Sequence, residues 1–359
     1  MKNKTIIQND IKKIDINMAD SKMQNASTIF YDALGDKFTI HGLYWVKENK
    51  NYHRLPDTLE TRDNLKALAA HPSGAYISFK TDSTSISVRV KNLSASYMAH
   101  MSACGQCGLD LYVKGDNEYI FLQTTKINKA EFEITMVKDM DKSMKEFRLY
   151  LPIYVALLEL SVGIDNTSTI EPLDDKRSQN IIWYGTSISQ GGCATRGGMS
   201  SSAILERLLK DYEVYNFGFS GNAHLDIEVA KILAEIKNVK YIIIESESNN
   251  TYARTKEKLF DFLKVLKDAN PDALMYVLSH YPNPYEAVNL AFHKNQLKQK
   301  RLHKSIVKRF NDPKVIYIDG EKVIKQDKYE VTVDGIHQTD LGFMDVAKYF
   351  NKLIRKNDH

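Results

Sequence analysis

The sequence has few of the features that mark disulfide-rich, fibrous or membrane-spanning proteins. Among its 359 residues are only three cysteines, 17 glycines and 8 prolines. These counts exclude a small disulfide scaffold and a collagen-like or low-complexity chain. The longest apolar segment, residues 149–164, is interrupted by Pro152 and Glu159. It falls short of the ~18 uncharged residues that a membrane-spanning helix needs.

An excess of charge of one sign is also missing. The 49 Lys and Arg residues against 45 Asp and Glu leave a net charge of +4. We therefore expect neither nucleic acid nor a membrane among the partners. Charges interrupt every apolar stretch of residues 1–20, so no signal-peptide core is predicted. We expect a cytoplasmic protein, a reducing compartment that suits an odd number of cysteines. The oligomeric state stays open, with a homo-oligomer as one option.

Core-forming residues are plentiful, because 43% of the chain is hydrophobic and it includes 20 Tyr and 14 Phe. At roughly 150 residues per domain, the length suggests two domains. We divide the chain into an N-terminal arm (1–36), a β-sandwich domain (37–170) and an α/β domain (176–359). The polar, charged stretch 165–180 forms the connection between the two domains.

The first half alternates apolar and polar residues with the period of two that is typical of half-buried strands. Turn-like breaks separate the alternating segments, and no convincing helix lies between them. Several short strands with one polar face predict an antiparallel β-sandwich. The clearest alternating segments are residues 86–90, 132–136 and 158–164.

The second half consists of continuous apolar runs separated by amphipathic segments, such as the one containing Leu259, Leu263 and Leu266. Five β-α units of this kind predict a doubly wound α/β/α domain around a five-stranded parallel sheet. Ligands bind such sheets at the carboxyl ends of the strands, so the loops after the runs are the places to look for chemistry. The runs are residues 181–184, 214–217, 241–244, 274–278 and 315–318.

The first such loop reads Gly185-Thr-Ser-Ile-Ser-Gln-Gly-Gly192. A serine two residues beyond a strand and just before a helix can have an exposed hydroxyl and a free backbone N–H. Ser187 is therefore a candidate nucleophile, with a helix cap or a phosphate-cradling loop as the alternatives. The G-x-G-x-x-G and P-loop lysine patterns are both missing, which argues against nucleotide binding.

Three further loops place polar groups at the same edge of the sheet. They contain Gly221, the pair Asn249 and Asn250, and the Asp334-Gly-Ile-His337 turn. An Asp three residues before a His can accept a hydrogen bond from one ring nitrogen of the His, while the other ring nitrogen faces a serine. Each of these motifs is weak alone. Serine, glycine, asparagine and D-x-x-H in this order, each after a different strand, are hard to obtain by accident.

With these four motifs the sequence resembles the SGNH (GDSL-like) hydrolases. The family's four blocks correspond to Ser187, Gly221, Asn249 and the pair Asp334 and His337. More narrowly, the resemblance is to the branch in which a jelly-roll-like β-sandwich precedes a flavodoxin-like hydrolase domain, and it covers about residues 37–355. The segments that carry this narrower resemblance are YGTSISQGGCATRGG, NFGFSGNAHLDIEVA, DGIHQTDLGF, HGLYW, RLPDTL and TDSTSISVRV.

The sequence departs from the family pattern in two blocks. Thr186 stands where the broad family has Asp, and the third block lacks Gly-x-Asn-Asp. The adjacent Asn249 and Asn250 leave the register of this block open by one residue, and we prefer Asn249. Glu245 and Glu247 are unusually acidic for a site that stabilises an oxyanion. We expect them to be structural or substrate-binding and to point away from the developing charge.

The resemblance implies a serine esterase that removes a short acyl group, acetyl above all, from a carbohydrate or another small polar substrate. Ser187 would be the nucleophile, His337 the general base and Asp334 its orienting partner. Ser187, Gly221 and Asn249 would form the oxyanion hole, without a metal or cofactor. The alternatives are an acyltransferase with the same triad and an inert glycan-binding protein. The sandwich would either bind sugar or only shape the cleft.

Four further features have alternative interpretations. Arg196, behind the nucleophile, and His280, after the fourth strand, are candidate substrate-binding residues. The basic amphipathic segment 294–309 predicts a solvated helix face or a site for an anionic partner. Cys104 and Cys107 form a lone C-x-x-C, for which we favour a turn over zinc or redox chemistry.

Overall fold

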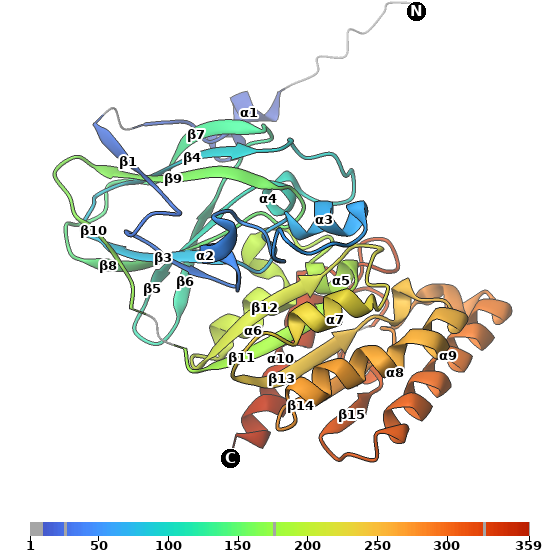
Figure 1. The fold of residues 1–359 in the computed structure, drawn as a ribbon. Helices are drawn as coiled ribbons and strands as arrows, with labels where there is room; N and C mark the ends of the chain where they lie inside the picture. The colour runs from blue at the N-terminus through green and yellow to red at the C-terminus, as the bar shows by residue number, and fades with distance from the viewer. Residues whose placement is uncertain (1–9, 25–26, 175–176, 326–327, 359) are drawn as a thin grey trace, which may run out of the picture.

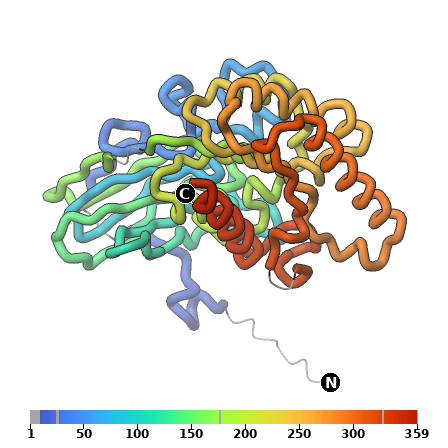
Figure 2. Tube along the Cα trace, turned by 90° about the horizontal axis from the view of Figure 1, so that it is seen from below, coloured from blue at the N-terminus to red at the C-terminus, as the bar shows by residue number. Residues whose placement is uncertain are grey.

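The computed structural model describes residues 10–24, 27–174, 177–325 and 328–358. The start of the predicted arm, residues 1–9, and the predicted domain boundary at residue 176 lie outside the described residues. A β-rich unit and an α/β unit lie side by side in both views (Figures 1 and 2). Within the described part of the chain, every helix is too short or too polar to cross a membrane.

Two antiparallel sheets form the N-terminal unit, as the alternating pattern predicts. One sheet has the strand order β1-β9-β4-β7, and the other has the order β10-β3-β8-β5-β6, with β2 paired to β3. Their facing apolar side chains form one core, in which Ile86, Val88 and Val90 of β4 are buried. The strands are β1 (Thr28–Asp32), β2 (Thr39–His41), β3 (Tyr76–Thr81), β4 (Ile86–Asn92), β5 (Asp110–Lys114), β6 (Tyr119–Thr124), β7 (Glu131–Val137), β8 (Lys145–Tyr150), β9 (Leu157–Asp165) and β10 (Ile170–Pro172).

The sandwich differs from the prediction in two respects. Residues 28–32, which we assigned to the arm, form β1 and pair with β9. This strand shows no clean alternation because its residues are intermediate or exposed along its length, as an edge strand allows. Short helices also occur in this half, namely α2 (Val46–Asn49), α3 (Asp63–Ala69) and α4 (Ala103–Gln106). Cys104 and Cys107 lie in and directly after α4 as free thiols.

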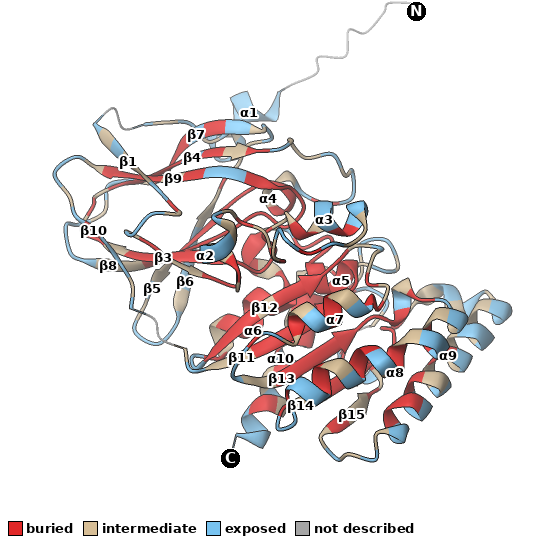
Figure 3. Cartoon of the chain, viewed as in Figure 1, coloured by how far each residue is buried: buried red, intermediate tan, exposed pale blue. Residues whose placement is uncertain are grey.

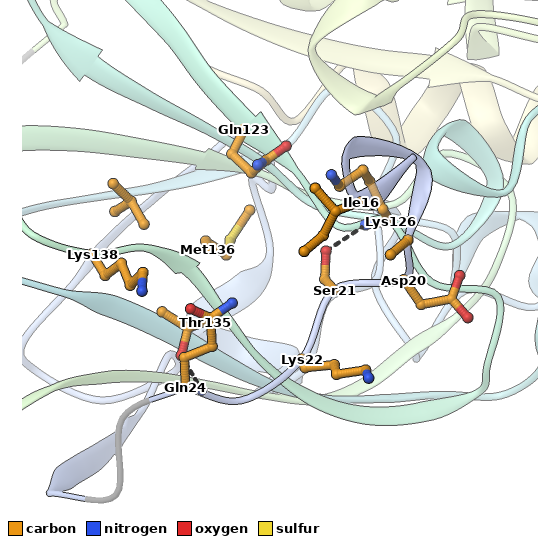
Figure 4. A pocket seen from close by; sticks show the side chains of 12 residues that line it. Ile16, Asp20, Ser21, Lys22, Gln24, Gln123, Lys126, Thr135, Met136 and Lys138 are labelled. Carbon is orange, nitrogen blue, oxygen red and sulfur yellow. Dashed lines mark hydrogen bonds between the residues drawn. The ribbon is translucent and has the colours of Figure 1, made fainter. Parts of the chain in front are cut away.

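The described part of the arm runs along the sandwich. After α1 (Ile11–Ile14) and the short helix η1 (Ile16–Met18), the chain continues beside β7. The backbone N–H of Thr135 donates to Lys22 O at 3.1 Å, and the N–H of Gln24 donates to the Thr135 hydroxyl at 3.0 Å. A hollow of about 340 Å³ lies between this segment and the sheet, and Figure 4 shows the side chains that line it. The arm thus packs on the sandwich.

The second unit is built on a parallel sheet with the strand order β12-β11-β13-β14-β15. This flavodoxin-like order is a doubly wound topology, and it confirms the predicted fold class. All five apolar runs became strands; the central residues of β11, β13 and β14 are buried on both faces, whereas the edge strands β12 and β15 contain intermediate residues (Figure 3). The strands are β11 (Gln179–Gly185), β12 (Tyr212–Gly218), β13 (Val239–Glu245), β14 (Leu274–Leu278) and β15 (Val315–Ile318).

Helices cover both faces of this sheet. On one face α6 (Ser201–Leu208) and α10 (Asp340–Asn357) pack over alternate strand residues such as Trp183. On the other face lie α7 (Ile227–Leu233), α8 (Tyr252–Ala269) and α9 (Leu290–Arg309), which pack over the remaining set. The predicted basic segment is the larger part of α9. Short helices occupy the loops: α5 (Ser187–Gln190), η2 (Gly197–Met199), η3 (Glu247–Asn249), η4 (Pro284–Ala287) and η5 (Gly320–Lys322).

The two units contact each other through buried polar groups. Arg148 of β8 pairs with Glu206 of α6 at 2.9 Å, and both side chains are almost fully buried. Gly74 of the sandwich has φ +79° and comes so close to the α/β domain that an added Cβ would lie 2.8 Å from the Cβ of Asn216. The units are therefore tightly docked, and the docking brings sandwich residues near the carboxyl ends of the parallel strands.

Candidate active site

Ser187 is the first residue of α5, directly after the turn that ends β11. Its neighbour Thr186 caps the helix, and its hydroxyl accepts a hydrogen bond from the N–H of Ile188 at 3.2 Å. Ser187 is 8% exposed. As the first helical residue it has no intrahelical acceptor for its backbone N–H, which also lacks an acceptor elsewhere in the described part of the chain. The turn thus presents a hydroxyl and a free N–H at one position.

His337 connects Ser187 to Asp334. Its Nδ1 donates to Asp334 Oδ2 at 2.7 Å, and its Nε2 lies 2.9 Å from the Ser187 hydroxyl oxygen. The other carboxylate oxygen, Oδ1, accepts from the backbone N–H groups of Ile336 at 3.0 Å and His337 at 2.8 Å. The structure therefore brings together the three predicted residues in the order that nucleophilic catalysis requires.

The environment of Asp334 favours its ionised form. Partial burial acts to raise its pKa, but hydrogen bonds from the backbone and side chain of His337 and from the backbone of Ile336 outweigh this effect. The pKa of Asp334 is consequently below its ordinary value. An ionised Asp334 holds the proton of His337 on Nδ1, so that Nε2 can accept the proton of Ser187.

The adjacent asparagines differ in the hydrogen bonds that they make. Asn250 uses both amide protons within the protein, because its Nδ2 donates to Ala223 O at 2.8 Å and to Ser246 O at 2.6 Å. Asn249 is anchored by its oxygen instead, which accepts from the N–H of Ala223 at 3.2 Å. Its Nδ2 has no acceptor among the described residues, and Asn249 lines the cavity beside Ser187. The contacts therefore favour Asn249 as the side-chain donor of the third block.

Gly221 is the residue of the second block at this cavity. It is exposed, has φ +65°, and lines the same cavity. Its backbone N–H has no acceptor in the part of the chain that the structure describes. Three unused N–H donors, from Ser187, Gly221 and Asn249, thus lie around one cavity.

Glu245 lies under the nucleophile turn rather than in the cavity. It is 1% exposed, and its Oε2 accepts from the Thr186 hydroxyl at 2.7 Å, from the Thr186 N–H at 3.2 Å and from the Ser189 hydroxyl at 2.9 Å. Burial raises its pKa to about 7, against the effect of these hydrogen bonds. Its contacts are those of a structural group, one of the two roles that we expected.

The two candidate substrate-binding residues lie outside the cavity. Arg196 turns toward the sandwich, where its Nη1 donates to Asp110 Oδ2 at 3.0 Å and to the Tyr112 hydroxyl at 2.6 Å. His280 is 2% exposed and lies between two carboxylates, 2.5 Å from Glu247 Oε1 and 3.2 Å from Glu286 Oε1. Their contacts are therefore structural in this arrangement.

Sequence reasoning missed a group of residues that connects the sandwich to the second block. Gln190 is fully buried, and its Oε1 accepts from the N–H of Ser220 at 2.9 Å, next to Gly221. Its Nε2 donates to Ile153 O at 3.1 Å and lies 3.2 Å from His71 Nδ1. Burial lowers the pKa of His71 to about 3, so its ring is a neutral acceptor. No local pattern marks these residues, because their partners are far apart in the sequence.

One cavity of about 1460 Å³ opens beside Ser187. Every residue that lines it belongs to the α/β domain. Among the described residues, the sandwich approaches the triad at two points: His100 Nε2 lies 3.9 Å from Asp334 Oδ2, and the Tyr154 hydroxyl donates to the backbone O of Ser187 at 3.4 Å. The sandwich therefore borders the triad without forming the cavity wall.

Two clusters of potential metal ligands occur among the described residues. The first comprises His100, Cys193 and the triad residues Asp334 and His337, whose hydrogen bonds to each other and to Ser187 already account for their arrangement. The second comprises His280, Glu286 and Glu321. Glu321 there forms an ion pair with Lys300, so a cation already neutralises this carboxylate.

Family comparisons match both units of the chain. Residues 28–170 match the N-terminal (GxDLY) domain of SGNH-hydrolase-type esterases, and residues 178–355 match the GDSL-like lipase/acylhydrolase family. The G-x-D-L-Y pattern is present here as Gly108 to Tyr112, and it includes the Asp110 and Tyr112 that bind Arg196. A search of curated protein sequences gives no significant match.

Solved structures share the whole two-domain architecture. A GDSL-like lipase from Bacteroides ovatus is 27% identical, with a TM-score of 0.85 over 92% of this chain and 97% of the other. A salicylyl-acyltransferase from a tetracycline biosynthetic pathway is 16% identical, with a TM-score of 0.74 over 93% and 99%. An acetyl xylan esterase from the rumen bacterium Butyrivibrio proteoclasticus is 12% identical, with a TM-score of 0.55 over 92% and 99%. The chain belongs to the SGNH (GDSL-like) hydrolase family, in the branch whose hydrolase domain follows an N-terminal β-sandwich.

Proposed function

We propose that the protein is a serine esterase that hydrolyses a short-chain acyl ester, preferably acetyl, of a carbohydrate or another small polar alcohol. The observation that carries the proposal is the chain of contacts from Asp334 through His337 to the Ser187 hydroxyl at the edge of a large cavity. Nucleophile, base and orienting carboxylate have the mutual geometry that acyl transfer needs.

In the first half of the reaction the Ser187 oxygen attacks the ester carbonyl carbon, and its proton passes to His337 Nε2. The carbonyl oxygen becomes an oxyanion, which the N–H groups of Ser187 and Gly221 and the Asn249 amide would bind. The bond to the alcohol oxygen then breaks, and the His337 proton goes to that oxygen. An acyl-serine remains.

In the second half, water attacks the acyl carbon and gives a proton to His337. The bond to Ser187 breaks, its oxygen takes up this proton, and the carboxylic acid leaves. Asp334 stabilises the imidazolium in both halves because it stays ionised beside Nδ1. These steps use only residues of this chain.

The substrate class is proposed from the names of structures that share the fold. Several solved structures with this fold are carbohydrate esterases by name, including the acetyl xylan esterase and a Clostridium thermocellum enzyme in complex with cellohexaose. At 11 to 16% identity, these likenesses concern the fold. The same fold in a salicylyl-acyltransferase keeps acyl transfer to an alcohol as the second candidate.

The test combines covalent labelling with a substrate series. A fluorophosphonate should label the wild-type protein on Ser187, located by mass spectrometry, and should not label Ser187→Ala. Nitrophenyl esters of increasing chain length should show the highest kcat/KM for acetate, and Ser187→Ala should abolish turnover. Product analysis with added alcohol separates hydrolysis from transfer. A wild-type protein that is neither labelled nor active on any ester would contradict the proposal.

A further inference from the structure

One face of α9 forms part of the cavity wall. Phe292, Asn295, Gln296 and Gln299 line the cavity from this helix. Their spacing of three and four residues puts them on one helical face. The lysines and arginines of α9 do not line the cavity. The helix therefore presents an uncharged face to the site and its basic residues elsewhere.

Side-chain amides line this cavity together with aromatic and aliphatic side chains. The carboxylates among its lining residues are Glu247, which pairs with buried His280, and the triad residue Asp334. Lys and Arg are missing from the lining residues, so an anionic substrate group finds no cation there. The amide-bearing residues are Asn249, Asn250, Asn283, Asn295, Gln296 and Gln299.

Two of these amides have an unused acceptor. Asn250 and Gln299 are 7% and 3% exposed, and their oxygens have no hydrogen-bond donor among the described residues. Their nitrogens are already engaged, because Gln299 Nε2 donates to Asn250 O at 2.8 Å and Asn250 Nδ2 donates to two carbonyls. The amide orientations are thus fixed, and each oxygen requires a donor. Hydroxyl groups are donors of the right kind for these oxygens.

Aromatic rings stand next to these amides. Tyr285 of η4 is 54% exposed and packs edge-on against Phe292, with 5.5 Å between the ring centroids. Val288, at the end of η4, is 80% exposed. An exposed ring face carries partial negative charge and attracts the weakly positive C–H groups of a sugar ring. Aromatic side chains can contact the C–H groups of a ligand, and the amides can bind its hydroxyls. Together they suit a polyhydroxylated ring.

A long acyl chain fits this wall poorly. It would cover the amides without offering them hydrogen bonds, and buried amides without partners are unfavourable. We propose that the wall formed by Tyr285, Phe292, Gln296 and Gln299 is the subsite for the alcohol part of the ester, and that this part is a neutral polyhydroxylated ring. The inference rests on the proposed esterase function, because it places the ring relative to Ser187.

The volume of the cavity is consistent with this assignment. At about 1460 Å³ it exceeds the roughly 300–1,000 Å³ of a site for a drug-sized ligand. An acetyl group at Ser187 would leave most of this space for the alcohol. The subsite therefore has room for more than one ring.

The test compares two kinds of substrate in matched variants. Monoacetylated methyl glycosides of xylose, glucose and mannose carry the ring, whereas 4-nitrophenyl acetate has no hydroxylated ring. For Tyr285→Ala and Gln296→Ala, we expect the ratio of kcat/KM for the best glycoside to kcat/KM for 4-nitrophenyl acetate to fall at least tenfold, mainly through KM. Lys294→Ala, an exposed position of α9 outside the cavity, is the control, with a ratio within twofold of wild type.

Two outcomes would overturn the subsite. One is an unchanged ratio in both cavity variants, provided that their thermal unfolding matches that of Lys294→Ala. The other is a wild-type protein that hydrolyses 4-nitrophenyl acetate and none of the three glycosides. A wild-type protein inactive on 4-nitrophenyl acetate and on all glycosides would instead contradict the esterase function itself, so the two failures are distinguishable.

Discussion

The carboxylate of Glu245 accepts hydrogen bonds from both the hydroxyl and the backbone N–H of Thr186, at 2.7 and 3.2 Å. Thr186 immediately precedes Ser187, and Glu245 ends the neighbouring strand β13. The broad family has Asp at the Thr186 position. Here the acidic group comes from the next strand, and Thr186 is its hydrogen-bonding partner. The nucleophile turn is therefore held to the sheet by a buried glutamate.

The burial of Glu245 predicts how the free energy of unfolding depends on pH. Its pKa is about 7 in the folded protein, raised by burial, against an ordinary value of 4.5. Between these values the folded state binds the more protons, so the free energy of unfolding falls as pH rises. The stability that comes from the protonated Glu245 is lost as the pH rises through about 7. Relative to Glu245→Gln, which does not titrate, wild type should lose roughly 3 kcal/mol of stability between pH 5 and pH 8.

Urea denaturation of both proteins at several pH values measures this difference. Glu133→Gln, at an exposed position of β7, controls for the loss of one negative charge. Parallel stability profiles for wild type and Glu245→Gln would show that the buried carboxyl titrates in the folded protein as it does in the unfolded chain.

The two adjacent asparagines should respond differently to removal of the amide. Asn249→Ala removes an unused donor beside Ser187, so kcat should fall about 10²-fold or more, while the loss of the acceptor for the Ala223 N–H should cost only about 1 kcal/mol of stability. Asn250→Ala leaves the carbonyls of Ala223 and Ser246 without their donors, so the free energy of unfolding should fall by about 2 kcal/mol or more. Kinetics on 4-nitrophenyl acetate and thermal unfolding of both variants test this. The reverse assignment would be established if only Asn250→Ala were slow in turnover.

We expect Arg196 to stabilise the contact between the two domains. Removal of its side chain leaves Asp110, which is 0% exposed, without its cation. Burial already raises the pKa of Asp110, and Arg196 opposes this rise. Arg196→Ala should therefore cost about 3 kcal/mol or more of stability. The double variant Arg196→Met with Asp110→Asn should recover part of it.

Substrate binding offers the contrasting readout for this variant. The KM of Arg196→Ala for acetylated glycosides should stay within about twofold of wild type at temperatures where it is folded, because Arg196 does not line the cavity. A stably folded Arg196→Ala variant with a raised KM would instead indicate that Arg196 binds substrate.

The order of elements and the location of the site followed from local pattern. Parallel strands end at one edge of a sheet, so Ser187, Gly221, Asn249 and the D-x-x-H turn, each after a different strand, had to lie near one another. Arg196 and His280 could not be assigned in this way. Arg196 finds its partner Asp110 86 residues away in the other domain, and the direction of its side chain depends on how the domains dock. The strand β1 could not be assigned from local pattern either, because its partner strand β9 lies more than 120 residues later.

Gln190 is the residue through which domain docking should affect catalysis. Its Oε1 accepts from the Ser220 N–H, and its Nε2 contacts Ile153 and the neutral ring of His71 in the sandwich. Gln190→Ala would free the loop that carries Gly221, so kcat should fall about tenfold or more, with KM changed less, because the oxyanion donors would lose their fixed positions.

The matched control is Gln106→Ala, another fully buried glutamine, whose amide bonds Ser96, Met98 and Met101 within the sandwich. Both substitutions remove buried hydrogen bonds and should cost roughly 2–3 kcal/mol of stability. Only Gln190→Ala should also lower kcat on 4-nitrophenyl acetate at temperatures where both variants are folded. Equal kcat values for the two variants would mean that the sandwich supports the hydrolase domain without positioning its oxyanion donors.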